Sequence, residues 1–393
     1  MGKKRKKLKK AITKPLKIAN EVVTETTSLV KESGELKQGL GLVSGVISLT
    51  LAILCFFGVI AFYFPAYLTT PELRAKYSVD FLRNLMFYSM VISGGISIAN
   101  ILLKRSRNIN ILSLTFIVIS TLLGGSGVEV KDFPSNTPYI GLDWFILDLL
   151  GSTMIFILIE KIFPLYKKQP IFRKEWQTDF IYFVVNHFLV GLVLLIVNFL
   201  VHKIFGLFVL NEFQNFIQNI TYLPQVFLCV LVADLIQYWV HRAYHEIPFL
   251  WRIHSIHHSI KTMDWLAGSR IHILELIFTR VSILGVLYVF GFEKTVMDAY
   301  IIIVGFQAVL NHSNVSLPWG FLKYFIVTPE FHHWHHSSEK EALDRNYAAH
   351  FSFLDYFFGT VVKSKNKFPE KYGVVGDYIP NDFIKQQLVP FKK

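Results

Sequence analysis

Long apolar stretches constrain this chain more than any other feature of its sequence. Eight of them occur, at about residues 42–64, 85–103, 109–123, 144–163, 180–201, 222–240, 273–290 and 297–310. Several approach or exceed the ~20 residues that an α-helix needs to cross a bilayer. Hydrophobic residues make up 52% of the 393 residues, and the mean hydropathy is +0.42, which is rare in a soluble protein of this length. We therefore expect an all-α, polytopic membrane bundle, in which the short third run and the last two runs also suit re-entrant or interfacial helices.

Positive charge is concentrated at the start of the chain. The formal net charge is +12, and Lys3 to Lys10 form a nearly continuous basic run. Such a run can bind nucleic acid. Beside a membrane span it instead marks the cytoplasmic side and contacts anionic lipid, so we expect no nucleic-acid partner. Cys55 and Cys229 lie in apolar runs and are too few for a disulfide framework.

The charges of the loops indicate how the chain is oriented. With the N-terminus in the cytoplasm, the loop from Lys104 to Arg107 and the basic linker from Lys167 to Lys174 both fall inside, whereas the net acidic loop from Glu129 to Asp143 falls outside. This distribution agrees with the positive-inside rule. Six crossings then return the chain to the cytoplasmic side at His241. We expect a multi-pass protein of a bacterial inner membrane or the endoplasmic reticulum, with its histidine-rich region on the cytoplasmic side.

Most of the 14 histidines lie in three clusters after residue 240. The clusters are His241 with His245; His254, His257 and His258; and His332, His333, His335 and His336. Spacings of three and four residues place side chains on one face of a helix, so two rings of each cluster can bind one ion. A single pair of histidines at this spacing is common on ordinary helices. Three such clusters within about 100 residues are not expected by chance. His272 and His312 lie between the clusters.

A metal ion explains why a membrane protein would gather so many imidazoles. Charged together, the rings would repel and resist burial, whereas neutral imidazole binds iron, zinc, copper and nickel. One ion takes at most five or six ligands, so ten candidate histidines imply two ions. The chain contains no HExxH sequence, and zinc-protease chemistry therefore lacks its usual general base. A di-iron site in an apolar setting suits activation of oxygen against an unactivated C–H bond.

The flanking residues make the pattern more specific. The first cluster reads HRAYH, the second LWRIHSIHHS and the third HHWHHS. Between them lies an NHS segment followed by Pro318 and Trp319, and after them come Asn346-Tyr347 and Asp355 followed by FGT. Over about residues 180–362 this order of motifs resembles the fatty acid hydroxylase/sterol desaturase superfamily, whose members are membrane-bound histidine-box di-iron oxygenases.

This resemblance implies a four-helix membrane base with a cytosolic helical cap that holds two iron ions, with zinc as a substitute on overexpression. It also implies O₂ as co-substrate and an external electron donor. Carried over by position, the metal ligands would be His241, His245, His254, His257, His258, His272, His312, His332, His335 and His336. The match is weaker at His272, because Ile273 stands where the family has proline.

Several other polar residues accompany the expected ligands. We expect Asp234, Glu275, Asn311 and His333 to support the ligands, and no catalytic side chain beyond the ligands themselves. Asp234 lies two turns before His241 on the same face, where it suits either fixing a ligand tautomer or a hydrogen bond between helices. Asp148 and Glu160 are assigned to helix packing. His187, His202 and His350 match no motif and are interpreted as structural or interfacial.

These observations divide the chain into a basic segment (1–40), additional transmembrane helices (41–165), a catalytic domain (175–365) and a tail (366–393). The function that fits best is hydroxylation or desaturation of a membrane lipid, such as a sterol, fatty acyl chain, alkylglycerol or carotenoid. Electrons would come from a cytochrome b5-like protein, a ferredoxin or a reductase. The alternative is a metal transporter or metal-binding membrane protein. Transport would place ligands at mid-membrane on broken helices, whereas these clusters follow the ends of apolar runs.

Overall fold

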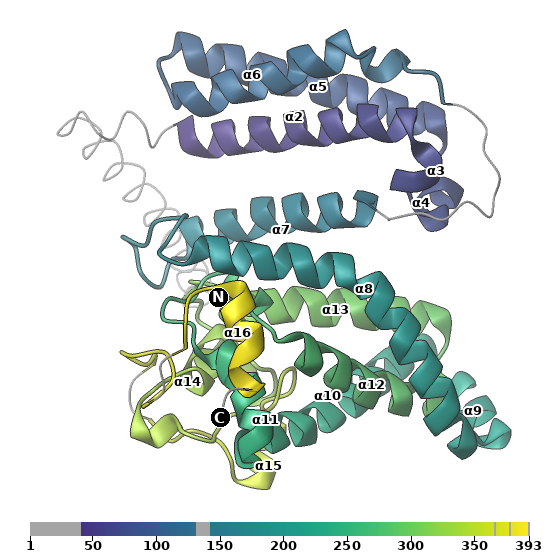
Figure 1. The fold of residues 1–393 in the computed structure, drawn as a ribbon, viewed down its shortest axis with the longest axis vertical. Helices are drawn as coiled ribbons and strands as arrows, with labels where there is room; N and C mark the ends of the chain where they lie inside the picture. Colours follow the sequence, from purple (N-terminus) through teal and green to yellow (C-terminus); the bar gives the residue numbers. More distant parts are fainter. Residues whose placement is uncertain (1–40, 131–141, 365–366, 377–378, 392–393) are drawn as a thin grey trace, which may run out of the picture. The chain divides into compact units, whose positions relative to one another are not determined.

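The computed structural model describes residues 41–130, 142–364, 367–376 and 379–391. The basic run at the N-terminus, most of the acidic loop and part of the tail therefore lie outside the described residues. Within the described part the chain is helical, and its only extended pairings are two isolated bridges, Pro164 with Val315 and Ser337 with Tyr372. The predicted all-α class is confirmed. The chain divides into two compact units, residues 1–154 and 155–393, and the division falls inside helix α7 (Figure 1).

Three long helices build the first unit. They are α2 (Leu42–Tyr63), α5 (Val79–Leu102) and α6 (Arg107–Leu122), with the short α3 (Pro65–Leu68), α4 (Pro71–Lys76) and η2 (Gly125–Gly127) at their ends. Buried serines join the three helices. The Ser48 hydroxyl lies 2.8 Å from that of Ser113 and 2.6 Å from that of Ser97. Small residues let helices approach closely, and the paired hydroxyls satisfy one another where water is absent.

The second unit contains the histidine-rich region. Its long helices are the end of α7 (Leu142–Ile162), α8 (Trp176–Ile204), α10 (Tyr222–Glu246), α12 (Ile273–Phe290) and α13 (Lys294–His312). Its shorter helices are η3 (Phe205–Phe208), α9 (Asn211–Gln218), α11 (Pro248–His258), η4 (Ala267–Ser269), η5 (Gly320–Tyr324), α14 (Pro329–His335), η6 (Lys340–Ala342), α15 (Phe353–Phe358), α16 (Phe383–Leu388) and η7 (Val389–Phe391). Helix α10 packs on α12 and α13, and α12 packs on α8. Buried Cys229, Ala233, Leu287 and Val296 lie in this core.

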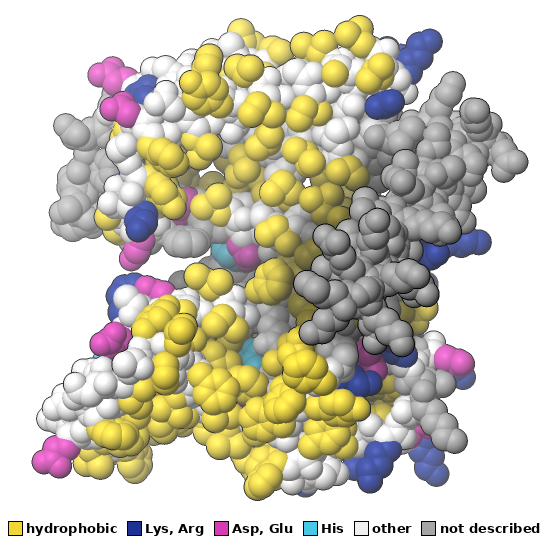
Figure 2. All heavy atoms as spheres, turned by 180° about the vertical axis from the view of Figure 1, so that it is seen from behind, with side chains coloured by type: hydrophobic (Ala, Val, Ile, Leu, Met, Phe, Trp, Pro, Cys, Tyr) yellow, Lys and Arg dark blue, Asp and Glu magenta, His cyan; other side chains and the backbone are white. Residues whose placement is uncertain are grey.

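All eight apolar runs are helices in the structure. Among the described residues, six helices are long and apolar enough to cross a membrane: α2, α5, α6, α10, α12 and α13. The end of α8 and the following α9 form a pair bent by 105°, which would give a seventh span if it counts as one. Hydrophobic side chains cover much of the outward surface of these helices (Figure 2), as expected where lipid rather than water surrounds them.

One end of the second unit collects the chain segments that carry the histidines. Helices α10 and α13 end there, α12 begins there, and α11 and α14 lie beyond those ends. The linker before α8 is fixed to the same end, because the Tyr166 amide donates to Asn314 Oδ1 (2.9 Å) and the Gln169 side chain donates to the Met263 carbonyl (2.8 Å). The basic linker and the histidine clusters therefore share one end of the helical base, as the loop charges predict.

Candidate metal centre

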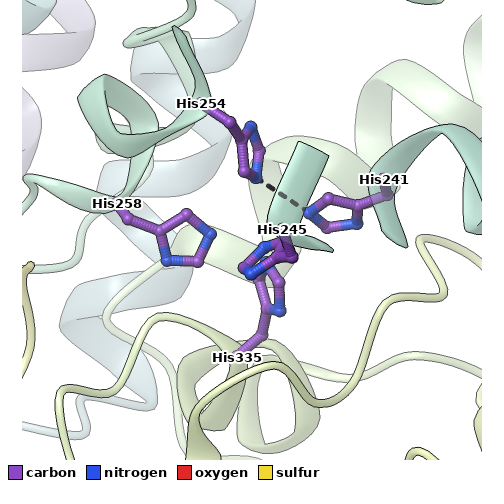
Figure 3. Close-up of side chains that lie close together, drawn as sticks. All are labelled: His241, His245, His254, His258 and His335. Atoms are coloured by element: carbon purple, nitrogen blue, oxygen red, sulfur yellow. Dashed lines mark hydrogen bonds between the residues drawn. The ribbon is translucent and has the colours of Figure 1, made fainter. Parts of the chain in front are cut away.

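Nine of the ten predicted ligands converge in two groups. The first group consists of His241, His245, His254, His258 and His335, and the second consists of His257, His312, His332 and His336. Within each group, one ring nitrogen from every member lies within 4.8 Å of all the others. In the first group the five rings converge on a common centre (Figure 3). Each group therefore offers enough imidazole nitrogen to hold one metal ion.

The helical repeat distributes the histidines between the groups. His241 and His245 are four residues apart on α10 and share the first group, as do His254 and His258 on α11. Neighbours in sequence separate instead, because successive side chains on a helix point about 100° apart. His335 joins the first group and His336 the second. Helices α11 and α14 thus contribute to both groups, which brings the groups side by side, with the His258 and His336 rings stacked 4.5 Å apart.

Hydrogen bonds orient the rings of the first group. His241 Nδ1 lies 2.7 Å from the Tyr347 carbonyl, and His335 Nδ1 lies 2.8 Å from the Arg345 carbonyl. His254 Nδ1 lies 2.8 Å from Glu275 Oε1. Since these partners are acceptors, each Nδ1 carries the proton, and the lone pair of each Nε2 remains available. His245 Nδ1 makes a longer contact of 3.3 Å with Asp344 Oδ1.

The second group is oriented in the same way. His257 Nδ1 lies 3.0 Å from the Arg270 carbonyl, and His312 Nδ1 lies 2.8 Å from the Ala308 carbonyl. Both rings are therefore protonated at Nδ1 and present an unprotonated Nε2. Gly268 lies directly against the His312 ring, where an added Cβ would come within 2.8 Å of Nδ1, so only glycine fits beside this ring.

The spacing of the Nε2 atoms tests whether the residues fit a metal. His257 Nε2 lies 3.2 Å from His312 Nε2, although neither atom has a proton to share. In the first group the Nε2 atoms of His245, His258 and His335 are buried and have no hydrogen-bond partner. Lone pairs that face one another in a buried space are costly without a proton or cation between them. The arrangement fits a cation bound at the centre of each group.

Burial also keeps the rings neutral, as metal ligands must be. Desolvation, reinforced by the neighbouring histidines, lowers the pKa of His254, His257 and His258 well below the usual value. The same causes lower the pKa of His332, His335 and His336. A neutral imidazole offers its lone pair without first losing a proton, so metal binding competes with no protonation near neutral pH.

His272 is the one predicted ligand that the structure does not bring to either group. It is the N-cap of α12, where its Nδ1 accepts the Leu274 amide at 3.0 Å, and its Nε2 lies 3.1 Å from the Gln387 carbonyl. Both ring nitrogens are thus used to begin α12 and to hold the C-terminal segment. The replacement of the family's proline by Ile273 coincides with this departure.

The predicted supporting residues take different positions around the groups. Glu275 contacts one of the predicted ligands, His254, directly. His333 lies 2.9 Å from the Tyr372 hydroxyl and 3.1 Å from the carbonyl of Ser313, the residue after His312. Asn311 donates to the Ala349 carbonyl at 3.1 Å.

Asp234 supports the centre through the backbone rather than through a ring. Its carboxylate accepts the amides of Ala349 (2.9 Å), His350 (3.1 Å) and Phe351 (2.6 Å), and it is fully buried. It thereby holds the segment that follows Tyr347, whose carbonyl orients His241. Asp234 is thus connected to His241, which also lies on α10, through a segment that is distant in sequence. This role is neither of the two considered from the sequence, which were fixing a ligand tautomer and a hydrogen bond between helices.

The three histidines that match no motif also lie outside both groups. His350 Nδ1 lies 3.0 Å from Gln307 Oε1, His202 Nδ1 lies 2.9 Å from the Asn198 carbonyl, and the His187 ring stacks on Phe183. Glu160 accepts the amides of Trp265 and Asn314, and thus ties α7 to two loops of the second unit.

Some supporting groups escape detection in the sequence because they are backbone atoms or distant acids. The carbonyls of Arg345 and Tyr347 carry no sequence signal. Asp355 accepts the Tyr347 and Ala348 amides, both at 2.8 Å, and so positions the segment that carries the Tyr347 carbonyl. Asp344 and Asn346, which flank Arg345, adopt positive φ (54° and 58°), a backbone conformation that Asn and Asp tolerate better than most residues.

A buried ionic network supports the second group. Arg270, whose carbonyl accepts from His257, is fully buried and pairs through its guanidinium with Asp179 (2.6 Å) and Glu175 (3.2 Å). Arg173 pairs with Asp179 and with Asp264 (2.8 Å). These pairs fix the start of α8 against the loop that precedes α12. Buried charges of this kind are stable only when paired and hydrogen-bonded.

Together the fold and the site define a helical membrane protein with two adjacent histidine groups suited to metal ions. Residues 226–360, which contain all nine converging histidines, match the fatty acid hydroxylase family. This match and the relatives below confirm the resemblance of this region to the fatty acid hydroxylase/sterol desaturase superfamily.

The chain is similar to several named proteins. The chain is 28% identical to an ornithine lipid hydroxylase of Rhizobium tropici over 169 residues. This alignment covers 43% of this chain and 51% of that protein. It is 29% identical over 201 residues to a putative methylsterol monooxygenase of Dictyostelium discoideum, covering 50% of this chain and 72% of that protein. It is 29% identical over 149 residues to a very-long-chain aldehyde decarbonylase of Oryza sativa subsp. indica, with 35% and 23% covered. The chain thus spans about half the length of the first relative, and no solved structure gives a significant match.

Proposed function

We propose that this protein is a membrane-bound oxidoreductase that hydroxylates or desaturates a lipid, using two iron ions, O₂ and an external electron donor. The observation that carries the proposal is the convergence of nine histidine rings in two adjacent buried groups. Their position at one end of a helical base supports a capped site rather than a transport path at mid-membrane.

The residues of the two groups would hold the ions and exclude water from them. Bound iron would supply the activation of O₂ that attack on an unactivated C–H bond requires. The Nδ1 partners, such as the Tyr347 carbonyl for His241 and Glu275 for His254, keep Nε2 unprotonated and directed inward. Burial of the rings keeps solvent away from the centre, which protects reactive species from side reactions.

The lipid class of the substrate is inferred from the relatives and the membrane helices. The names of two relatives indicate action on an ornithine lipid and on methylsterols, and the chain itself has six candidate membrane spans among its described residues. A substrate dissolved in the bilayer would reach a site at the end of these spans without entering water. Sterols, fatty acyl chains, alkylglycerols and carotenoids all meet this condition. The donor would be a cytochrome b5-like protein, a ferredoxin or a reductase.

Lipid profiling under heavy-oxygen O₂ tests the proposal. Cells that express the chain should form a lipid product that is absent from cells without it and from cells that express the His335→Ala variant. A hydroxylase would place the label in the product, whereas a desaturase would give an unlabelled alkene. If no lipid depends on the intact chain while cellular metal content does, the oxidoreductase proposal is wrong and metal transport replaces it.

A further inference from the structure

A band of exposed aromatic side chains lies outside the histidine groups and has no role in holding them. We name it the aromatic band and define it as Trp239, Phe321, Tyr324, Phe325, Tyr356 and Phe357. These residues come from three elements: α10, the η5 region and α15. All six are exposed, and Phe321 and Phe357 show 71% and 81% of their surfaces. Aromatic residues this exposed and this clustered mark an interaction surface.

Contacts between its elements hold the band as one surface. The rings of Tyr324 and Tyr356 lie 5.8 Å apart, and the Ser352 hydroxyl donates to the Lys323 carbonyl at 2.8 Å. Phe358 joins the band from within, with its ring 5.2 Å from Trp239 and 5.0 Å from Phe357. The exposed rings therefore stand on a packed base instead of on separate mobile loops.

The band lies close to the ends of two candidate spans. Trp239 belongs to α10, two residues before the ligand His241, and η5 begins eight residues after α13 ends at His312. Cations accompany the rings: the Arg242 guanidinium lies 5.4 Å from the Trp239 ring, and the Lys323 ammonium lies 5.6 Å from the Tyr324 ring. Tryptophan and tyrosine beside lysine and arginine at a span end are typical of the membrane–water interface.

Charge at the rim favours lipid over an ionic protein partner. Arg242 pairs with Glu246 at 2.7 Å, and Lys323 lies 3.6 Å from Glu330. The rim is thus locally neutralised, and the attraction of the band is apolar. An apolar surface that continues a spanning helix beside its cationic end fits the boundary between headgroups and acyl chains. We propose that the aromatic band is a second membrane contact, which rests the cap of the second unit on the bilayer beside its spans.

The inner side of the band leads toward the first histidine group. Phe358 stacks on Tyr238 at 4.8 Å, and Tyr238 contacts Tyr347 at 5.8 Å. The Tyr347 carbonyl orients His241. The lipid surface would therefore lie a few rings away from the first group. If the proposed function holds, on which this step rests, the band presents bilayer lipid to the first group.

Site-specific labelling tests the membrane contact without any assay of activity. The buried Cys55 and Cys229 are replaced by alanine, and Phe357→Cys carries an environment-sensitive fluorophore. Exposed Glu341→Cys on η6 is the matched control. The full chain is placed in phosphatidylcholine vesicles with or without nitroxide-labelled lipid. We expect strong quenching by the nitroxide lipid at position 357 and little at position 341, with the opposite order for aqueous iodide.

The outcomes separate this inference from the proposed function. Iodide quenching at position 357 equal to that at 341 would overturn the membrane contact, as would burial of the label that depends on protein concentration, which would indicate a second copy. The double variant Phe321→Ser, Phe357→Ser should keep its metal content and lose most of its lipid turnover. Unchanged turnover would overturn lipid presentation. A wild-type chain with no lipid turnover would refute the oxidoreductase proposal and leave the labelling result standing.

Discussion

The Nε2 atoms of His241 and His254 lie 3.0 Å apart, and the Nδ1 atom of each ring faces an oxygen acceptor. Neither Nε2 then has a proton for the other, so the two lone pairs repel unless a cation lies between them. We therefore expect metal to be part of the folded state, because an ion that binds the native groups and not the unfolded chain stabilises the fold.

Removal of metal should therefore destabilise the protein. We expect treatment with a chelator to lower the Tm of the detergent-solubilised chain by roughly 5 °C or more, and added ferrous iron to restore it under anaerobic conditions. Scanning fluorimetry measures the effect. A Tm that does not respond to chelation or to added iron would contradict the interpretation of both groups as metal sites.

Adjacent residues at the C-terminal end of α14 give a matched test of the two groups. His335→Ala removes a ring of the first group, and His336→Ala removes a ring of the second. Elemental analysis of protein purified anaerobically should find about two ions per wild-type chain and about one in each variant. The reason is that each variant removes a histidine from one group and leaves the other group intact. His350→Ala is the control, since this buried ring pairs with Gln307 outside both groups. Equal losses in His350→Ala would indicate a general effect on folding.

Glu275 should matter through the single hydrogen bond that it accepts from His254. Glu275→Leu removes the acceptor, and we expect metal affinity to fall by about 10–100-fold. Glu275→Gln keeps an oxygen that can accept the same proton and should lose much less. Competition with a chromophoric chelator measures both. Glu246→Gln, an exposed acid that pairs with Arg242, is the control and should bind like the wild type. Equal affinity for Glu275→Leu and wild type would exclude this role.

Much of the helical framework follows from apolar patterning alone. The run predicted at residues 273–290 is α12 with the same bounds, and the short third run is α6. The short helices carry no such pattern, because elements such as α15 have six residues and gain their stability from tertiary contacts. The 105° bend after α8 likewise depends on packing instead of on local sequence.

The histidines that converge in the two groups were predictable from the sequence, whereas their division between the groups was less so. Histidine type and spacing identify which residues can bind metal, but the assignment of His335 and His336 to different groups needs the placement of α14 among α10, α11 and α13. Spacing could not reveal that His272 caps a helix. Nor could it show that Asp234 binds amides 115 to 117 residues away, since long-range backbone contacts leave no local pattern.

The ionic network behind the second group allows a contrast between buried and exposed pairs. Asp179 and Arg270 are both fully buried, whereas Lys294 and Asp298 are 83% and 54% exposed. Asp179→Ala leaves buried arginine charge with fewer partners and should destabilise the fold by about 3–5 kcal/mol. Asp298→Ala should cause a much smaller change, because solvent screens exposed pairs. Reversible denaturation in mixed micelles compares the two variants. A similar loss in both would show that burial does not decide the strength of these pairs.

Orientation in the membrane is tested by the exposed residues at the two ends of the second unit. Lys168 and Lys261 lie in segments that meet beside the histidine groups, whereas Glu212 lies on α9, after α8 has run away from that end. The positive-inside rule assigns the basic linker to the cytoplasmic side. With cysteine placed singly at each position in a chain that lacks Cys55 and Cys229, we expect a membrane-impermeant thiol reagent to label Glu212→Cys in intact cells. Lys168→Cys and Lys261→Cys should react only after the membrane is opened. Labelling of Lys261→Cys in intact cells would place the metal centre on the outer face, and opposite results for the two lysine positions would contradict the shared end seen in the structure.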